Sequence, residues 1–499
     1  MPSTPSDHLR SAISQTAADL ARAIPADRDS ALLTLLQALA GLPQPALVTG
    51  SPDPFTGVTV TGIGSSRALQ LLLQEPRSAT DAPEGDLEHW ARSFLARCAD
   101  LARAELVLAH VETGFMRLVP GPGNRLDARI AQRATPLRWR ERVDDLWWAD
   151  YEGAREPLPS APPIARATAL IDRLAYRQDL PAHGAIGSID LDLVGRCLAA
   201  LVVLAGDRPV TVHDRHTLLL DLAERLTAPE TAIADVLDVL TLDSDNAAWH
   251  AAVPGISDPP LVRLPTGALA LPLRNLTGNP VRFVARELRR RDPSGYHSAA
   301  AAREDAFRAD LYRLFSHRRF VASPGSIELR RAKGDIRTDI DAAIFDRKSN
   351  TLALFELKAN EPFARSTAEL VRTQENCRAA GRQVAGALDW INRHGADEIL
   401  NRIDRRSAKT FRVQKVQAFV LGRHLVEGDD RRAVWATWPQ LLRVLGDTPV
   451  EDLGANPVVA LAGRLQRDRP LLMPGDVRES TVVDLGSLTF VVSPMSNRE

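Results

Sequence analysis

The chain has 499 residues, of which 44% are hydrophobic and 25% charged, the balance of an ordinary globular protein. Its formal net charge of -1 excludes a global field that would attract nucleic acid or membrane, so any such preference has to be local. This length exceeds what one hydrophobic core supports and predicts two or three domains. Isolated cysteines, no signal-peptide pattern and no apolar stretch long enough to span a bilayer predict a cytoplasmic protein without a membrane partner.

Residues 1–292 are predicted to form a mainly helical region, because apolar residues recur there at spacings of three and four. Two interruptions are predicted as short strands: residues 57–64, and a hairpin over 261–273 that turns at Thr266 and Gly267. We expect this region to recognise a substrate or recruit a protein partner. The clearest helical segments are residues 30–41, 87–110, 163–178 and 216–226.

A domain boundary is predicted at Asp292-Pro293, since proline disfavours a helical conformation at the residue before it. The order of elements then changes to that of an α/β layered domain, over 293–446. Residues 447–499 are predicted as a C-terminal helix and a strand pair. The expected elements of the α/β domain are a helix near 298–315, strands at 319–323 and 327–332, a hairpin within 338–360, a helix over 363–393, a strand at 415–423 and a helix at 438–445.

The hairpin gathers charged groups at one point. Strand side chains alternate between faces, so Glu356 and Lys358 share a face at the end of the apolar stretch "LALFELKA". An apolar strand of this kind is expected to be central and buried. Asp341 begins the preceding strand, and the turn "RKSN" returns the chain, which brings Asp341 to the level of Glu356 and Lys358. Two carboxylates and one ammonium are therefore predicted to meet.

Such a group suits phosphate chemistry with a divalent ion. Two carboxylates offer the oxygen ligands that Mg²⁺ prefers and leave positions open for water and phosphate. A lysine beside them can orient water or stabilise developing negative charge. Lysine is rare here: it occurs only at residues 333, 348, 358, 409 and 415, while the other 57 of 62 basic residues are arginine. Lys358 is thus predicted to stand where arginine would not serve.

The pattern of Asp341, fourteen residues and then Glu356-Leu357-Lys358 resembles the PD-(D/E)XK, or restriction-endonuclease-like, nuclease superfamily over residues 296–446. The resemblance implies a mixed sheet flanked by helices. It also implies Mg²⁺ or Mn²⁺ held by Asp341, Glu356 and the backbone carbonyl of Leu357, with Lys358 as the catalytic lysine. No proline precedes Asp341, and Asp339 is the alternative ligand.

Two further site residues follow from the same resemblance. Many members place a glutamate on the first helix of the core, which corresponds here to Glu304, with Asp310 as the alternative. Several members add a glutamine on the helix after the lysine, and Gln383 is preferred to Gln374 because the helix around it is more clearly amphipathic.

The resemblance implies a metal-dependent endo- or exonuclease that hydrolyses DNA phosphodiester bonds, in restriction, repair or phage defence. Residues 296–445 hold 27 Lys and Arg against 19 Asp and Glu, and this local excess suits a polyanionic partner. Two alternatives stay open: a nuclease directed at RNA, and a non-enzymatic docking or scaffold protein with a nuclease-like core.

Overall fold

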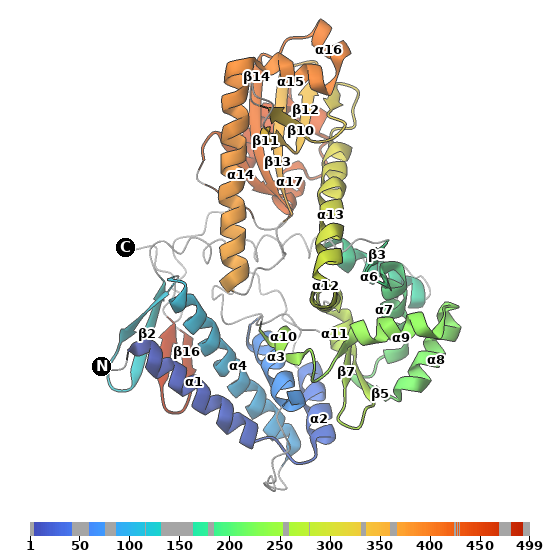
Figure 1. Ribbon diagram of the computed structural model, residues 1–499, viewed down its shortest axis with the longest axis vertical. Helices are drawn as coiled ribbons and strands as arrows, with labels where there is room; N and C mark the ends of the chain where they lie inside the picture. The colour runs from blue at the N-terminus through green and yellow to red at the C-terminus, as the bar shows by residue number, and fades with distance from the viewer. Residues whose placement is uncertain are drawn as a thin grey trace.

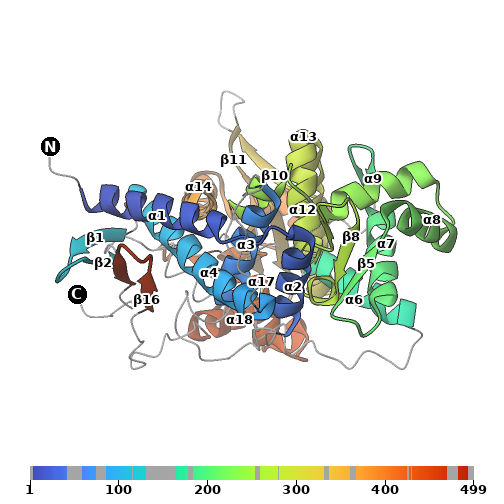
Figure 2. The same cartoon turned by 90° about the horizontal axis from the view of Figure 1, so that it is seen from below.

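The computed structural model describes residues 4–41, 59–74, 86–114, 116–130, 163–177, 184–252, 259–278, 280–330, 336–359, 367–423, 426, 428, 430–468 and 481–492. Over these residues the fold is mixed α/β, as the sequence predicts. Figure 1 shows an upper body, the sheet domain, standing above two lower bodies, the N-terminal lobe and the middle lobe. Figure 2, seen from below, shows the two lobes side by side. None of the described helices has the length and apolarity that crossing a bilayer requires.

The N-terminal lobe combines four helices with a four-stranded sheet, which α1 and α4 contact. The sheet has the order β1-β2-β17-β16, and β17 pairs with β2 in parallel, so a strand pair from the far end of the chain completes it. The predicted helices at residues 30–41 and 87–110 are confirmed. The elements are α1 (Pro5–Arg22), α2 (Arg28–Gly41), α3 (Thr59–Gln74), α4 (Leu87–Glu112), β1 (Met116–Pro120), β2 (Arg125–Ile130), β16 (Thr481–Asp484) and β17 (Thr489–Val492).

One sequence prediction fails in this lobe. Residues 59–64, expected as part of a strand, form the first turns of α3, and residues 57 and 58 lie outside the described part of the chain. Gly64 allows α3 to approach α4 closely, because a Cβ at this position would lie 2.8 Å from the backbone oxygen of Leu95. Packing between helices therefore decides the conformation against the local β-branched pattern.

The middle lobe surrounds the buried helix α7 and a second four-stranded sheet of order β5-β8-β7-β6. The predicted hairpin is confirmed as β7 and β8, and Gly267 has the positive φ of 93° that its turn requires. The elements are α6 (Pro163–Arg177), β3 (Ala185–Ile186), β4 (Ile189–Asp190), α7 (Leu191–Ala205), β5 (Val210–His213), α8 (Arg215–Leu226), α9 (Glu230–Leu240), β6 (Thr241–Leu242), α10 (Ala247–Ala251), β7 (Leu261–Arg263), β8 (Leu269–Pro272), α11 (Leu273–Thr277) and α12 (Pro280–Arg291).

The break predicted at Asp292 is present. Asp292 alone separates α12 from α13 (Pro293–Leu314), and its carboxylate accepts the N–H of Gly295 at 2.8 Å as the N-cap of α13. Pro293 occupies the first helical position, where no backbone donor is needed. In Figure 1, α13 rises from α12 into the sheet domain.

The sheet domain is built on five strands in the order β15-β14-β13-β12-β9. β12 and β13 form an antiparallel hairpin, while β13, β14 and β15 run parallel. The predicted order of helix, strands, hairpin, long helix, strand and helix is confirmed. The elements are β9 (Phe320–Ala322), β10 (Ile327–Arg330), β11 (Ile336–Ile340), β12 (Ala342–Asp346), β13 (Thr351–Lys358), α14 (Thr367–His394), α15 (Ala396–Ile403), α16 (Arg405–Thr410), β14 (Lys415–Gly422), β15 (Ala433–Thr437), α17 (Trp438–Leu445), a 3₁₀ turn (Val450–Asp452) and α18 (Pro457–Arg467).

Helices cover both faces of this sheet. One face packs on α13, α17 and α18 through a core that includes Phe307, Phe355 and Phe419. The other face packs on α14 and α15 through Trp390 and Ile399 among others. The helix and the strand pair predicted within 447–499 are both present, but they join different bodies. α18 packs on the sheet domain, whereas β16 and β17 belong to the N-terminal lobe.

Candidate active site

Asp341 lies in a bend between β11 and β12, one residue before the strand in which it was expected. Its carboxylate is buried, and Oδ2 accepts the backbone N–H of Leu357 at 2.7 Å. The side chain thus continues the hairpin ladder beyond the last backbone pair, Ala342 with Phe355. On the other side, Arg308 of α13 donates from Nε to the backbone oxygen of Asp341 at 2.6 Å. These two contacts fix the carboxylate beside β13.

Glu356 and Lys358 leave β13 on one face, as strand alternation predicts. β13 lies between β12 and β14, so Glu356 is only 3% exposed, while the longer Lys358 side chain is 21% exposed. Nζ of Lys358 lies 2.5 Å from Oε1 of Glu356. The strand ends at the side of the sheet domain that faces the two lower lobes (Figure 1). Asp341, Glu356 and Lys358 are therefore together, as the sequence predicts.

The pKa values of both carboxyl groups at this site are raised. Burial, and then the nearby Asp341 carboxylate, raises the pKa of Glu356 to about 8. Burial also raises the pKa of Asp341 to about 6, against the opposing effects of the Leu357 N–H and of Lys358. Burial disfavours the charged form of Lys358, but the Glu356 carboxylate outweighs this effect and the lysine pKa rises. Two buried carboxyls thus share one ammonium, and their ionised form lacks one compensating positive charge.

A divalent cation would supply that charge, and the atoms present fit one. Oε1 of Glu356 is buried, and its partner among the described residues is Nζ of Lys358 at 2.5 Å. The Leu357 N–H points at Asp341. Because the N–H and the carbonyl of a strand residue lie on the same edge of the strand, the Leu357 carbonyl also faces the side of Asp341. Within the described chain no cluster of three or more His, Cys, Asp and Glu side chains is placed for a metal ion. The site therefore offers two carboxylates and one backbone oxygen, which suits Mg²⁺ or Mn²⁺ with water and phosphate as further ligands.

Glu304 lies on α13 one turn before Arg308, and the two side chains form an ion pair at 3.4 Å. Its negative charge contributes to the raised pKa of both Asp341 and Lys358, so it is electrically part of the group. The alternative, Asp310, is paired with an arginine: its Oδ2 accepts Nη1 of Arg423 at 3.0 Å in a buried pair. Of the two acids, the structure favours Glu304 as the one near the site.

Gln383 of α14 donates from Nε2 to Oδ1 of Asp339 at 3.2 Å. The charge of Asp339 in turn raises the pKa of Asp341 and Glu356. Gln383 thus reaches the site through Asp339, whereas no contact in the described chain joins Gln374 to it. Between the two acids considered as ligands, Asp341 contacts β13 directly and Asp339 contacts α14.

Two arginines near the site were not identified from the sequence. Arg308 holds the Asp341 carbonyl, and the backbone N–H of Arg423 donates to the Lys358 carbonyl at 2.8 Å. The guanidinium of Arg423 lies over the rings of Phe307 and Trp438. The only sequence signal for Arg308 was its position four residues after Glu304, and an arginine-rich chain offers many such pairs. Arg423 carried no signal at all.

Comparison of the chain with protein-family models, with curated protein sequences and with solved structures found no match in any of the three. The functional argument therefore depends on the geometry of Asp341, Glu356 and Lys358.

Proposed function

We propose that the protein is a metal-dependent nuclease that hydrolyses phosphodiester bonds of DNA. The observation that carries the proposal is a pair of buried carboxylates, Asp341 and Glu356, which lie beside Lys358 and receive few donors from the described residues. Titratable groups perturbed in this way by burial and by like charge are typical of active sites. The excess of basic residues in the sheet domain fits a polyanionic substrate.

In this proposal Asp341, Glu356 and the Leu357 carbonyl hold Mg²⁺ or Mn²⁺. When bound, such an ion neutralises charge on the phosphate and lowers the pKa of a coordinated water. The Lys358 ammonium, fixed by Glu356, orients the attacking water and stabilises the negative charge that develops on phosphorus oxygens. The water oxygen forms a bond to phosphorus, the bond to the 3′ oxygen breaks, and that oxygen takes a proton. The products are a 5′-phosphate and a 3′-hydroxyl.

The arrangement of elements adds support. α13, the β12–β13 hairpin, α14 and the parallel strand β14 follow one another in the order that the restriction-endonuclease-like superfamily implies. Glu304 and Gln383 lie on the two helices from which members of that superfamily contribute such residues. Roles in restriction, repair or phage defence, and a cytoplasmic location, belong to the same proposal by analogy.

Cleavage of plasmid and linear DNA, measured with Mg²⁺, Mn²⁺ or a chelator, tests the proposal. Asp341→Asn and Lys358→Ala should each abolish cleavage, while the exposed residues Asp447 and Lys409 provide matched controls as Asp447→Asn and Lys409→Ala. Equal cleavage by all five proteins would assign the activity to a contaminant. No cleavage by the wild type with any divalent ion would favour the docking alternative, and preferential cleavage of RNA in parallel reactions would favour the RNA-directed alternative.

A further inference from the structure

The outward face of α14 carries four exposed arginines, Arg372, Arg378, Arg382 and Arg393. At 3.6 residues per turn, Arg378, Arg382 and Arg393 lie within about 60° of one another, and Arg372 lies at the edge of the same stripe. The residues that α14 buries against the sheet, such as Cys377 and Val384, lie on the opposite side. We refer to these four arginines as the α14 stripe.

The arginines of the α14 stripe differ from those on neighbouring helices. Arg290 and Arg291 of α12 both pair with the buried Glu287, and Arg308 and Arg313 of α13 pair with acids on their own helix. In contrast, none of the four stripe arginines has an ion-pair or hydrogen-bond partner in the described part of the chain. Their donors are therefore available to an external anion.

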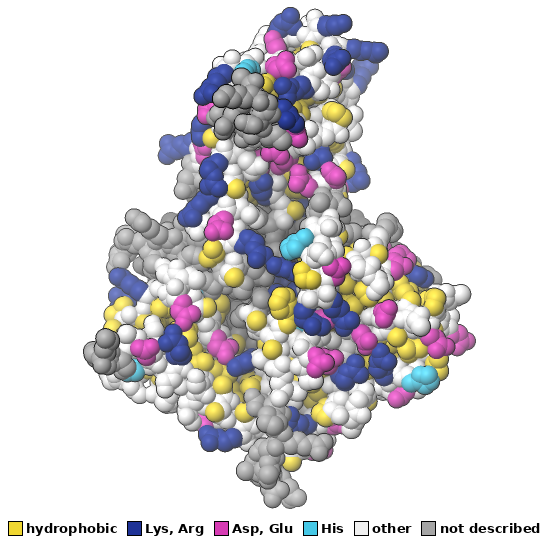
Figure 3. All heavy atoms as spheres, viewed as in Figure 1, with side chains coloured by type: hydrophobic (Ala, Val, Ile, Leu, Met, Phe, Trp, Pro, Cys, Tyr) yellow, Lys and Arg dark blue, Asp and Glu magenta, His cyan; other side chains and the backbone are white. Residues whose placement is uncertain are grey.

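Acids dilute this charge only in part. Glu375 is exposed on the same side of the helix, and Asp389 also faces it but is engaged with another residue. The arginines still outnumber the acids two to one. Figure 3 shows Lys and Arg side chains gathered along the edge of the sheet domain that α14 forms. The stripe is consequently a linear positive surface.

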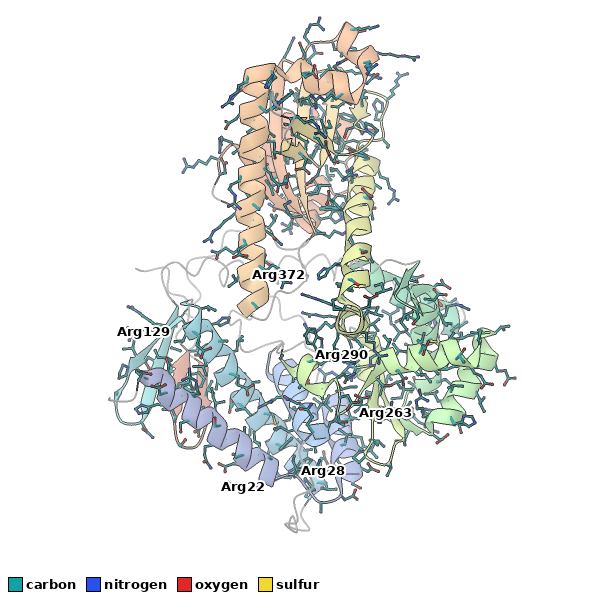
Figure 4. The ribbon with its side chains drawn as sticks, in the orientation of Figure 1. Arg22, Arg28, Arg129, Arg263, Arg290 and Arg372 are labelled. Atoms are coloured by element: carbon teal, nitrogen blue, oxygen red, sulfur yellow. The ribbon has the colours of Figure 1, made fainter. Side chains whose placement is uncertain are left out.

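The stripe and the candidate active site are connected through α14. Gln383 follows Arg382 in the sequence and lies about 100° further around the helix. Its side chain contacts Asp339, two residues before Asp341. Arg372 lies near the lower end of α14 (Figure 4), on the side of the sheet domain where β13 ends. From Arg372 to Arg393 the helix rises about 31 Å, close to one turn of duplex DNA at about 34 Å. A polyanion lying along α14 would thus reach the end of the sheet domain at which the carboxylates lie.

We infer that the α14 stripe binds the phosphate backbone of duplex DNA and delivers it to the site at the end of β13. Guanidinium groups pair with phosphate through two parallel donors, and backbone contacts of this kind position a duplex without reading its sequence. Single-strand binding surfaces use aromatic side chains on which bases stack. The sequence of α14 has Trp390 as its one aromatic residue, and this ring is buried, which favours a duplex.

Duplex binding in a chelator, where no cleavage occurs, tests the inference by fluorescence anisotropy on a labelled duplex of about 30 base pairs. The test protein is the full chain with Arg378→Gln, Arg382→Gln and Arg393→Gln. The charge-matched control replaces three exposed arginines outside α14 that have no partner among the described residues: Arg117→Gln, Arg166→Gln and Arg208→Gln. Circular dichroism melts verify that both triple variants fold.

The stripe variant should bind the duplex at least about 30-fold more weakly near 0.1 M salt, because each neutralised phosphate releases counterions. Its slope of log affinity against log salt should become shallower by about 2 to 3. The control variant should stay within about threefold of the wild type. Unchanged binding by the stripe variant, or an equal loss in both variants, would overturn the inference. A larger loss on single-stranded DNA or on duplex RNA would overturn the choice of partner.

This inference rests on the proposed function, yet the two can fail separately. The Lys358→Ala protein should lose cleavage and keep duplex affinity, whereas the stripe variant should lose duplex affinity and keep Mn²⁺ binding at Asp341 and Glu356. Cleavage that survives Lys358→Ala contradicts the proposed function alone. Normal duplex binding by the stripe variant, together with loss of cleavage in Lys358→Ala, contradicts the stripe alone.

Discussion

The two ends of the β12–β13 hairpin treat buried carboxylates in opposite ways. At the turn end, Asp346 is fully buried and receives two donors from Arg319, the N–H of Lys348 and the hydroxyl of Ser349. At the open end, the described residues give the Asp341 carboxylate one N–H and leave Glu356 with Lys358 alone. The same strands therefore hold one carboxylate that is satisfied and two that are not.

The pKa values follow this difference. Burial alone would raise the pKa of Asp346, but Arg319, Ser349 and the backbone outweigh burial and the pKa falls. Glu287 in the middle lobe behaves similarly, because Arg290, His250 and Arg291 overcome burial and lower its pKa to about 2. Burial dominates at Asp341 and Glu356 instead. At Asp346 and Glu287 the protein supplies enough donors to offset burial, and the deficit at the open end indicates a site prepared for an added cation.

The largest effect, and the strictest test of this difference between the two ends, is expected from Glu356→Gln. The amide keeps the shape of the side chain but removes the charge that a divalent ion needs, so cleavage should fall more than about a thousandfold. Because the buried charge is also removed, thermal stability without metal should be unchanged or higher at pH 8. Metal-dependent cleavage and calorimetric melts on the same protein provide both readouts. Normal cleavage by this variant, or a much lower melting temperature, would indicate that Glu356 has a structural role like that of Asp346.

The second largest effect is expected at the turn end. Arg319→Ala leaves Asp346 buried without its main partner and should reduce the free energy of unfolding by about 3 kcal/mol, which denaturant unfolding measures. Arg318 is exposed and provides the neighbouring control, since Arg318→Ala should change stability by less than about 0.5 kcal/mol. Similar values for the two variants would mean that Asp346 tolerates burial as Asp341 does.

The third prediction concerns pH. Asp341 and Glu356 have folded-state pKa values above their ordinary values, so the folded protein binds protons more tightly than the unfolded chain. Their contribution to stability is complete below about pH 4 and is lost as pH rises through the folded values near 6 and 8. Without metal, stability should fall by about 5 kcal/mol between about pH 5 and pH 8.5. Mg²⁺ should restore it most at the high end, and the double variant Asp341→Asn, Glu356→Gln should remove this dependence.

The smallest effect is expected from Arg308→Gln. Arg308 holds the backbone of Asp341 without touching its carboxylate, so its loss should weaken Mn²⁺ binding about tenfold. Isothermal titration measures this affinity independently of cleavage. Arg313→Gln is the control, because Arg313 is exposed on the same helix and pairs only with Asp310 among the described residues. Equal affinities in the two variants would show that the bend at Asp341 needs no support from α13.

The sequence predicted the positions of Asp341, Glu356 and Lys358 at the open end well, because these positions depend on residues close together in the chain. Fourteen residues separate Asp341 from Glu356, and strand alternation with a short turn sets their relative positions. Arg308 and Arg423 could not be found in this way, since their contacts depend on how α13 and β14 pack against β13. Residues 59–64 were assigned to a strand for a related reason. The close approach of Gly64 to α4 is a contact between residues far apart in the sequence, and the local pattern does not contain it.

The parallel pairing of β17 with β2 has a consequence for biosynthesis. Arg125 pairs with Thr489 and Ala128 with Val492, partners separated by about 360 residues of chain. At translation rates of about 5 to 20 residues per second, β2 emerges from the ribosome roughly 20 to 70 seconds before its neighbour exists. During that interval the β1–β2 ribbon presents a bare edge, and the first lobe to be synthesised is among the last to close.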